Sequence, residues 1–333
     1  MFILGLQGSP RKNGNTNFLL SAFIDETKKY GAQTKIVQVS KKKILPCIGC
    51  GSCEKTGICV IKDEMGSEII PLFRKADVIV LASPIFFYST TAQMKIIIDR
   101  SQSLWSRKYR LQLADPCSKT RRGFLLSLGA TKGDDLFYGV SLTAKYFFDA
   151  VDAVDEGSLT YRHIENKGDM EKHPTVIKDI CSKVEKFIKP LSEKKTVLFA
   201  CVENACRSQM AAGFAQKIAK DKINILCGGS KPSEKINQTM IDVMREKGID
   251  MAYRIPGSID QAVNEAVPSL TVTMGCGEKC PNIQGTKYLD WDLPDPAGKS
   301  VDFMRNVRDE IEKRVTKLIS RSFENSFLQD RQT

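Results

Sequence analysis

Short apolar runs rich in β-branched residues alternate along the first half of this chain with longer amphipathic stretches. The short runs predict strands at Phe2–Gln7, Lys35–Val39, Val78–Ser83, Phe124–Ser127 and Glu156–Tyr161. The longer stretches predict helices at Asn15–Tyr30, Gly66–Arg74, Thr91–Arg107 and Thr175–Pro190. Because strand, helix and strand follow one another repeatedly, we expect parallel pairing in a doubly wound α/β layer.

The same pattern restarts after a charged bridge at Ser192–Lys195. Further strands are predicted at Thr196–Ala200, Ile223–Leu226 and Ser269–Met274, and further helices at Ser208–Ala219, Asn237–Lys247 and Val301–Ile319. A chain of 333 residues is long enough for two domains with separate cores. We therefore expect two doubly wound parallel-sheet domains of the α/β class, at residues 1–192 and 193–321, followed by a polar, frayed tail at 322–333.

The composition of the sequence limits which cellular compartment and which partners we expect for the protein. The longest nearly uninterrupted apolar run, Val78–Phe87, is half the ~20 residues that a membrane helix needs, and Met1–Asn15 lacks the basic start of a secretory signal. We therefore expect a cytoplasmic protein that does not associate with membranes. Its 11 cysteines are clustered, which in a reducing compartment favours metal or redox chemistry over structural disulfides, whereas its 2 histidines argue against histidine metal sites.

The net charge of the chain changes these expectations little. The formal net charge of +11 suits anionic ligands, although most Lys and Arg side chains are explained as solvated helix faces. No basic block is interleaved with aromatic residues, so a nucleic-acid partner is not expected.

Three loops of small, polar or aromatic residues follow predicted strands of the first domain. The first opens a helix, where free amides and hydroxyl groups suit the terminal monophosphate of FMN. It matches neither G-x-G-x-x-G nor G-x-x-x-x-G-K-[ST], and taken alone it is explained equally well as a plain turn. Three such loops at one edge of a parallel sheet favour a flavin site. The residues predicted to bind FMN are Ser9, Arg11, Asn13, Asn15, Thr16, Pro84, Ile85, Phe86, Phe87, Ser89 and Gly129.

Four cysteines lie within thirteen residues between the second and third predicted strands: Cys47, Cys50, Cys53 and Cys59. Glycines among them let the backbone wrap tightly. Compact C-x2-C-x2-C runs are typical of [4Fe–4S] clusters. A tetrahedral zinc site is the main alternative, although such sites usually pair two C-x2-C units across a longer loop. Unligated cysteines are the third interpretation.

The segments GSPRKNGNT, PCIGCGSCEKTGICVIKDEM and SPIFFYSTTAQMKIIIDR make residues 1 to about 190 resemble the NADPH-dependent FMN reductase family, in its iron–sulfur flavoprotein branch. The resemblance implies a flavodoxin-like fold, bound FMN and a [4Fe–4S] cluster close to the flavin. It also implies electron transfer as the activity and a homodimer that completes the flavin site. It does not fix the electron donor, for which NAD(P)H and ferredoxin are candidates.

The second domain begins with a strand that runs into Cys201-x5-Arg207-Ser208, and a helix opens there. Five intervening residues can turn their amide N–H groups inward around a tetrahedral oxyanion, with two of its oxygens bound by Arg207. We expect Asn204, Cys206 and Ser208 to contribute to this oxyanion site. The same groups favour the thiolate form of Cys201, which would then be a nucleophile toward phosphate-like centres.

Two reactions fit this motif. A phosphatase needs a general acid, for which Asp295 in the segment WDLPDP is the candidate and Asp292 the reserve. An arsenate reductase instead needs further thiols, because a second sulfur must attack Cys201 to expel arsenite. Cys276 could form that disulfide and Cys280 could then take it over. Cys206 could also trap Cys201 in a protective disulfide, which is a competing interpretation.

The segments CVENACRSQMA, CGGSKPSEKINQTMIDVMREKGID and VTMGCGEKCP with WDLPDPAG make residues 195 to 320 resemble the low-molecular-weight tyrosine phosphatase superfamily, most closely its arsenate-reductase branch. The resemblance implies Cys201 as nucleophile, Arg207 as oxyanion ligand and Asp295 as acid. It also implies Cys276 and Cys280 as the redox pair, with three residues between them, fewer than in many thioredoxin-coupled members.

Together the halves predict a self-contained arsenate reductase, whose flavin and cluster domain re-reduces the disulfide; thioredoxin is the alternative reductant. The second hypothesis is a low-molecular-weight protein tyrosine phosphatase-type hydrolase regulated by a fused NAD(P)H-dependent FMN reductase domain. A non-catalytic redox sensor is the third.

Overall fold

The computed structural model describes residues 1–275 and 282–329, with the backbone alone for residues 321–329. The chain forms two compact units. The first comprises Met1–Gln112 and Thr120–Glu193, and the second comprises Leu113–Lys119 and Lys194–Thr333. Among the described residues, no helix has both the length and the apolar character needed to cross a membrane.

The first unit is built on a five-stranded sheet in the order β2-β1-β3-β4-β5, with every pair parallel. The strands are β1 (Phe2–Gln7), β2 (Gln33–Gln38), β3 (Val78–Pro84), β4 (Arg122–Leu128) and β5 (Val154–Tyr161). The chain order reverses between β1 and β3, so the carboxyl end of β1 lies at the point where doubly wound folds bind ligands. This is the flavodoxin-like order, which confirms the predicted fold class for this half.

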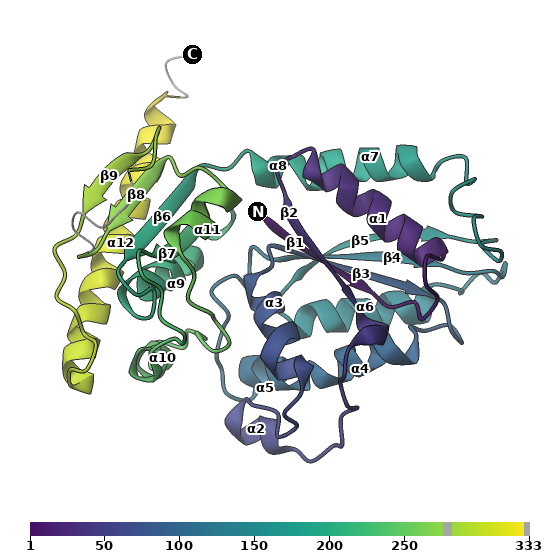
Figure 1. Ribbon diagram of the computed structural model, residues 1–333, viewed down its shortest axis with the longest axis horizontal. Coiled ribbons are helices and arrows are strands. Elements are labelled where there is room, and N and C mark those ends of the chain that lie inside the picture. The colour runs from purple at the N-terminus through teal and green to yellow at the C-terminus, as the bar shows by residue number, and fades with distance from the viewer. Residues whose placement is uncertain (276–281, 330–333) are drawn as a thin grey trace. The chain divides into compact units, whose positions relative to one another are not determined.

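Helices cover both faces of that sheet: α1 and α7 lie on one side and α3, α4, α5 and α6 on the other (Figure 1). The α-helices are α1 (Asn15–Lys28), α2 (Ser52–Thr56), α3 (Ile70–Lys75), α4 (Ala92–Arg100), α5 (Gln102–Tyr109), α6 (Tyr138–Ala150), α7 (Val176–Phe187) and α8 (Lys189–Ser192). A 3-10 turn, η1 (Val39–Lys41), and a π-helical turn, η2 (Met65–Ile69), complete the unit. Because both faces are covered, β1 is buried along its whole length, which explains its unbroken apolar sequence.

The second unit is built on a four-stranded parallel sheet in the order β7-β6-β8-β9. Its strands are β6 (Thr196–Cys201), β7 (Asn224–Gly229), β8 (Leu270–Thr273) and β9 (Lys287–Asp290). Its helices are α9 (Arg207–Ala219), the 3-10 turn η3 (Lys220–Lys222), α10 (Gln238–Arg245), α11 (Ile259–Glu265) and α12 (Val301–Gln329). Buried residues of α9, α10 and α12 share one core, and α11 packs on Leu198 and Ala200 from the opposite face of β6. The predicted α/β architecture is confirmed here too.

Some predicted elements are wrong in detail. The single helix predicted over Thr91–Arg107 is two helices, α4 and α5, which meet at Ser101, whose hydroxyl donates to the Ile97 carbonyl at 2.9 Å. The helix predicted to close the chain at Ile319 instead continues through Gln329, into the segment predicted as a frayed tail. The sequence pattern also missed α6, α11 and β9. Helix α6 was missed because Tyr138 and Tyr146 expose large apolar side chains on the face expected to be polar.

One segment of the second unit comes from the middle of the first half of the sequence. Leu113–Lys119 follows α5, and Ala114 pairs in parallel with Ile249. The Ala114 amide donates to the Gly248 carbonyl at 3.0 Å, and the Asp250 amide donates to the Ala114 carbonyl at 2.8 Å. By this division the segment belongs to the second unit, although it lies within residues 1–192 of the sequence.

Candidate functional site

The three polar loops of the first unit enclose one cavity of about 500 Å³ at the carboxyl edge of its sheet. Of the residues predicted to bind FMN, those that line it are Ser9, Arg11, Asn15, Thr16, Pro84, Ile85, Phe86 and Gly129. Asn13, Phe87 and Ser89 stand outside this lining. Sequence reasoning missed the remaining wall, which is formed by Lys12, Gly14, Leu128, Ala130, Ile164, Glu165 and Lys167. Three of these follow β5, where no recognisable motif marks them.

The first loop presents main-chain donors to this cavity. The N-cap of α1 is Gly14, which has no side chain to bond to the first-turn amides. Ser9 is held by its own surroundings, since its amide donates to Gln7 Oε1 at 2.5 Å and its hydroxyl accepts from the Arg11 amide at 3.2 Å. Free amides at a helix N-terminus, with Arg11 and Lys12 beside them, suit a phosphate group.

Asn15 has a structural task in addition to lining the cavity. Its Nδ2 donates to the Asn166 carbonyl at 2.7 Å, and its Oδ1 accepts from the amides of Gly168 and Met170 at 3.0 and 3.3 Å. The side chain therefore ties the start of α1 to the loop after β5. That loop supplies the wall at Glu165 and Lys167, so Asn15 shapes the cavity as well as bordering it.

Phe86–Ser89 forms a two-residue turn at the end of β3. Phe86 and Ser89 exchange both backbone hydrogen bonds at 3.0 Å, and Phe87 and Tyr88 have φ values of +47° and +59°. Positive φ at both central positions defines a type I′ turn, which is uncommon for aromatic residues. Phe87 is fully exposed, so its side chain does not line the cavity of its own chain as the sequence predicted.

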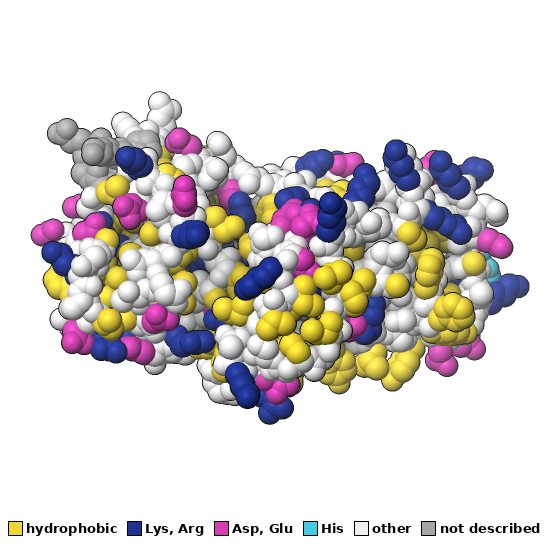
Figure 2. Space-filling model, turned by 60° about the horizontal axis from the view of Figure 1, so that its bottom comes forward, with side chains coloured by type: hydrophobic (Ala, Val, Ile, Leu, Met, Phe, Trp, Pro, Cys, Tyr) yellow, Lys and Arg dark blue, Asp and Glu magenta, His cyan; other side chains and the backbone are white. Residues whose placement is uncertain are grey.

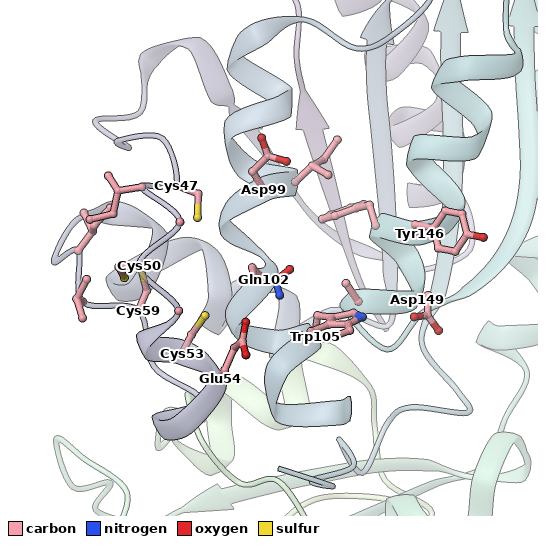
Figure 3. Close-up of a pocket in the computed structure, with 18 of the residues that line it drawn as sticks. Cys47, Cys50, Cys53, Glu54, Cys59, Asp99, Gln102, Trp105, Tyr146 and Asp149 are labelled. Atoms are coloured by element: carbon pink, nitrogen blue, oxygen red, sulfur yellow. The ribbon is translucent and has the colours of Figure 1, made fainter. Parts of the chain in front are cut away.

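The four clustered cysteines line a second cavity, of about 630 Å³, against α5 and α6 (Figure 3). Cys47 and Cys53 point toward the same opening from opposite sides of it. Cys47 and Cys50 are exposed, whereas Cys53 and Cys59 are half-buried, and Ser106 Oγ donates to Cys53 Sγ at 3.7 Å. The side chains that face them across the cavity include Gln102, Trp105, Tyr146 and Asp149.

The four thiols are a donor set that could hold a metal group. Four thiols are soft ligands suited to iron–sulfur clusters or zinc. Zinc holds thiolates at about 2.3 Å around one point. In the part of the chain that the structure describes, no three His, Cys, Asp or Glu side chains are gathered in that way. All four cysteines line the cavity together with residues of α4, α5 and α6.

The second unit holds Cys201 at the carboxyl end of β6, with 2% of its surface exposed. Its Sγ lies 3.0 Å from Ser208 Oγ and accepts a hydrogen bond from the Asn204 amide at 3.2 Å. Asn204 has φ +51°, a left-handed conformation that turns the loop back toward the sulfur. The sulfur therefore sits at the base of a loop whose donors point at it.

Backbone hydrogen bonds to four of its carbonyls fix the outer side of the loop after Cys201. The carbonyls of Cys201, Val202, Glu203 and Ala205 accept hydrogen bonds from the backbone amides of Ser230, Lys231, Ser233 and Asn237, at 3.1, 2.8, 3.0 and 3.2 Å. These hydrogen bonds fix the direction of the loop peptides, and the Asn204 amide points inward at Cys201 Sγ. The packing is close: a Cβ at Gly229 would lie 2.7 Å from the Val202 carbonyl oxygen.

Asn204 connects this loop to its surroundings. Its Nδ2 donates to Ser208 Oγ at 2.8 Å, and its Oδ1 accepts from Gln209 Nε2 at 3.0 Å and from the Gly257 amide at 2.9 Å. The predicted residues Asn204 and Ser208 are thus joined in one chain of hydrogen bonds that ends at Cys201. Gln209 and Gly257 were missed, the first although it follows Ser208 directly.

Arg207 and Asp295 meet at the mouth of the loop. Arg207 is buried, and its Nη1 donates to the Leu293 carbonyl at 3.0 Å while its Nη2 lies 3.4 Å from Asp295 Oδ2. Asp295 itself is largely exposed. The Asp295 carboxylate therefore pairs with the guanidinium that the sequence analysis assigned to oxyanion binding. A bound oxyanion would compete with Asp295 for Arg207.

The remaining cysteines of this unit differ in reactivity. Burial, reinforced by nearby negative charge, raises the pKa of Cys206 to about 12. Cys276 and Cys280 lie outside the described residues. Gly275, which precedes them, lies against Arg207: a Cβ there would be 2.7 Å from Arg207 Nη1.

Two family models match different parts of this chain. The family model for NADPH-dependent FMN reductase matches residues 1–119, and that for low molecular weight phosphotyrosine protein phosphatase matches residues 196–327. An iron-sulfur flavoprotein of Methanocaldococcus jannaschii is 38% identical over 31% of this chain and 53% of its own length. The glutaredoxin arsenate reductase of a Synechocystis species is 35% identical over 38% of this chain and 98% of its own length. Arsenate reductase 2 of Staphylococcus haemolyticus is 34% identical over 37% and 95%. The chain thus spans about half of the flavoprotein and nearly all of the arsenate reductases.

Proposed function

Because the second unit of this chain belongs to the low molecular weight phosphotyrosine protein phosphatase family with its arsenate reductases, and residues 1–119 match the model of the NADPH-dependent FMN reductase family, we propose that the protein is a two-domain arsenate reductase. The observation that carries the proposal is the buried Cys201 sulfur at the base of a loop that has four carbonyls hydrogen-bonded outward, to residues 230–237. The amides and Arg207 are left to bind a tetrahedral oxyanion.

The proposed first step joins arsenate to Cys201. Its thiolate displaces one oxygen of arsenate, which leaves as water after protonation, and a sulfur–arsenic bond forms. Arg207 exchanges Asp295 for two arsenate oxygens, since a guanidinium binds such anions through parallel hydrogen bonds. Ser208 and the Asn204 amide hold the sulfur in line.

The proposed second step reduces the arsenic. The thiolate of Cys276 attacks Cys201 Sγ, and the sulfur–arsenic bond breaks with its electron pair going to arsenic, which leaves as arsenite. The two cysteines have together lost two electrons and are joined by a disulfide. Cys280 then attacks Cys276, so that Cys201 leaves as a thiolate and a Cys276–Cys280 disulfide remains. Two electrons and two protons reopen it.

The first unit is proposed to supply those electrons. When bound, FMN can exchange electrons singly or in pairs, and a [4Fe–4S] cluster exchanges them singly. The cavity of the three loops would hold FMN, with its phosphate at the start of α1, and the four cysteines would hold the cluster. NAD(P)H or ferredoxin would be the donor, whereas thioredoxin or glutaredoxin would be the external alternative to the first unit.

The experiment compares arsenite formation by purified protein, supplied with NADPH or reduced ferredoxin, with and without thioredoxin or glutaredoxin. Turnover without either small protein supports internal reduction. Turnover only with one of them keeps the arsenate reductase and removes the internal route. No arsenite under any condition contradicts the arsenate reductase itself. The Cys53→Ser variant is the matched control, because it changes the first unit only.

A phosphatase is the second candidate, supported by the family match and by Asp295 at the mouth of the loop, where an acid would be needed. The Cys276→Ser variant separates the two functions. Loss of arsenite formation with phosphate-ester hydrolysis retained supports the reductase. Hydrolysis as the sole activity of the unmodified protein supports the phosphatase, regulated by the reductase domain.

We also propose that the first unit forms a homodimer. Tyr138, Leu142 and Tyr146 recur every four residues along α6 and are exposed by 68%, 42% and 64%. Figure 2 shows hydrophobic side chains gathered on the face of the first unit that carries α2, α4, α5 and α6. Sedimentation of the protein and of a Tyr138→Glu/Tyr146→Glu variant tests this: a monomeric variant supports the interface, and a monomeric wild type contradicts it.

A further inference from the structure

Arg100, the last residue of α4, is a buried arginine placed next to the cysteine segment. Its side chain is 1% exposed. Its Nη1 donates to the Leu45 carbonyl and to Asp63 Oδ2, both at 2.7 Å. Its Nη2 donates to Asp63 Oδ1 at 3.0 Å and to the Ile61 carbonyl at 3.4 Å. Four of its five N–H donors are thus used on the two ends of the segment that carries Cys47, Cys50, Cys53 and Cys59.

Asp63 completes this attachment. Its Oδ2 accepts from the Leu45 amide at 3.0 Å and its Oδ1 from the Met65 amide at 3.1 Å. Burial acts to raise the pKa of Asp63, but the hydrogen bonds from Arg100 and Leu45 outweigh it and lower the pKa. Residues 45 and 63 are therefore held together by one ionised pair, and the cysteine segment is closed at its base.

The fifth N–H donor of Arg100 is the one on Nε. Its Nε is buried and finds no acceptor among the residues that the structure describes. A buried donor without an acceptor is costly, so such a group indicates a missing partner. Cys59 is the candidate, because it is half-buried and lies two residues before Ile61, whose carbonyl accepts from the same guanidinium at 3.4 Å.

We propose that Arg100 is a positioning residue for the metal group of the four cysteines, closing the segment through Asp63 and donating its Nε–H to the Cys59 sulfur when that sulfur is a metal-bound thiolate. The inference rests on the proposed iron–sulfur cluster. A donor and a positive charge at a ligand sulfur stabilise the more negative, reduced form, so Arg100 raises the reduction potential. Closing the segment slows loss of iron.

The first experiment compares the Arg100→Gln, Arg100→Lys and Asp63→Asn variants, all purified anaerobically. Iron and sulfide content, the rate of iron loss to a chelator and the reduction potential are measured. We expect each variant to lose iron roughly 10 to 100 times faster. The potential should fall in Arg100→Gln, fall less in Arg100→Lys, which keeps the charge, and not fall in Asp63→Asn, which keeps the donor.

Arg121→Gln is the matched control. Arg121 is 1% exposed in the same unit, and its Nε, Nη1 and Nη2 donate to the carbonyls of Ala76, Val151 and Arg74 at 3.0, 2.9 and 3.1 Å. A loss of folding alone would affect this variant equally, but its potential should match the wild type. An unchanged potential in Arg100→Gln, with iron retained, overturns the proposal.

A second experiment tests the bond directly in the wild-type protein, with Arg100→Lys to assign the signal. Protein labelled with ¹⁵N-arginine is reduced, and nitrogen coupling to the cluster spin is measured by pulsed electron paramagnetic resonance. Coupling that disappears in Arg100→Lys supports the Nε–H···Sγ bond, and its absence from the wild type overturns the bond. Absence of iron and sulfide from the wild type is a separate outcome, which overturns the proposed cluster and the inference with it.

Discussion

The two cysteine-bearing loops of this protein are held in opposite ways. The segment Cys47–Cys59 is fixed at its ends, by Arg100 on residues 45, 61 and 63 and by Arg107 on the Gly57 carbonyl at 3.3 Å. Between those points its glycines at 49 and 51 have open space around them. The segment Cys201–Ser208 is instead bound at almost every peptide, and its reactive sulfur is buried.

The difference matches the two roles proposed for these loops. A loop that wraps around a bulky metal group needs fixed ends and adaptable peptides between them, because the group itself organises the middle. A loop that prepares a nucleophile has to hold its dipoles in place before the substrate arrives, because reorientation during the reaction would cost activation energy. Four predictions test this contrast, in order of decreasing expected effect.

Cys201→Ser is expected to lower arsenite formation by on the order of 10³-fold or more, because the hydroxyl is a far weaker nucleophile and cannot form the disulfide. Iron, sulfide and flavin content of the first unit should stay at wild-type levels. Rate assays and metal analysis of the same preparation check both parts. Arsenite formation within tenfold of the wild type would remove Cys201 from the mechanism.

Asn204→Ala is expected to lower the rate on the order of 10²-fold and to lower the free energy of unfolding by about 1–3 kcal/mol. It removes the hydrogen bonds to Ser208, Gln209 and Gly257 and leaves an alanine at φ +51°. Asn204→Gly loses the same hydrogen bonds, but glycine tolerates a φ of +51°. We therefore expect Asn204→Gly to be more stable than Asn204→Ala but equally low in activity. Equal stability of the two variants would contradict the claim of backbone strain.

Gly57→Ala and Gly51→Ala form a matched pair in the first loop, since both glycines have φ +69°. We expect Gly51→Ala to lower the free energy of unfolding by about 1–2 kcal/mol, because only the left-handed backbone is penalised. Gly57→Ala should cost more, since its Cβ would also lie 2.6 Å from Arg107 Nη1.

Denaturant unfolding followed by Trp105 fluorescence in a Trp291→Phe background isolates the first unit for this measurement, because these are the 2 tryptophans of the chain. Equal costs for the two glycine variants would show that Arg107 does not fix the end of the segment.

The smallest expected effect concerns the acid stability of the contact between Glu246 and α12 in the second unit. Hydrogen bonds from Arg305 and Arg308 of α12 lower the pKa of Glu246 to about 2. Because the folded pKa lies below the ordinary value of 4.5, the pairing stabilises the fold above pH 4.5 and is lost as the pH falls toward 2. The groups are partly exposed, so the effect is modest.

We therefore expect the melting temperature of the second unit to fall between pH 5 and 3, and to fall less steeply in Glu246→Gln, which has already lost the ionised partner. Calorimetry at several pH values measures this. Parallel pH profiles for the two proteins would assign the acid sensitivity to other groups.

Much of the proposed flavin site could be predicted because parallel strands end at one edge, so Ser9, Pro84 and Gly129 had to lie near one another. Glu165 and Lys167 could not, since nothing in the sequence marks the loop after β5. Phe87 shows that residue type alone does not predict where a side chain lies. This aromatic residue is next to the predicted ring site, but it is fully exposed because its turn forces positive φ.

The sequence by itself determined the reacting groups and their order, because C-x2-C-x2-C and C-x5-R-S are local spacings between neighbours in one loop. Only the tertiary structure decided which donors those groups receive. The amides that turn the Cys201 loop inward come from residues 230–237, and the arginine that closes the cysteine segment lies 37 residues beyond Asp63. Such partners are selected by burial and packing summed over distant parts of the chain, which no local pattern encodes.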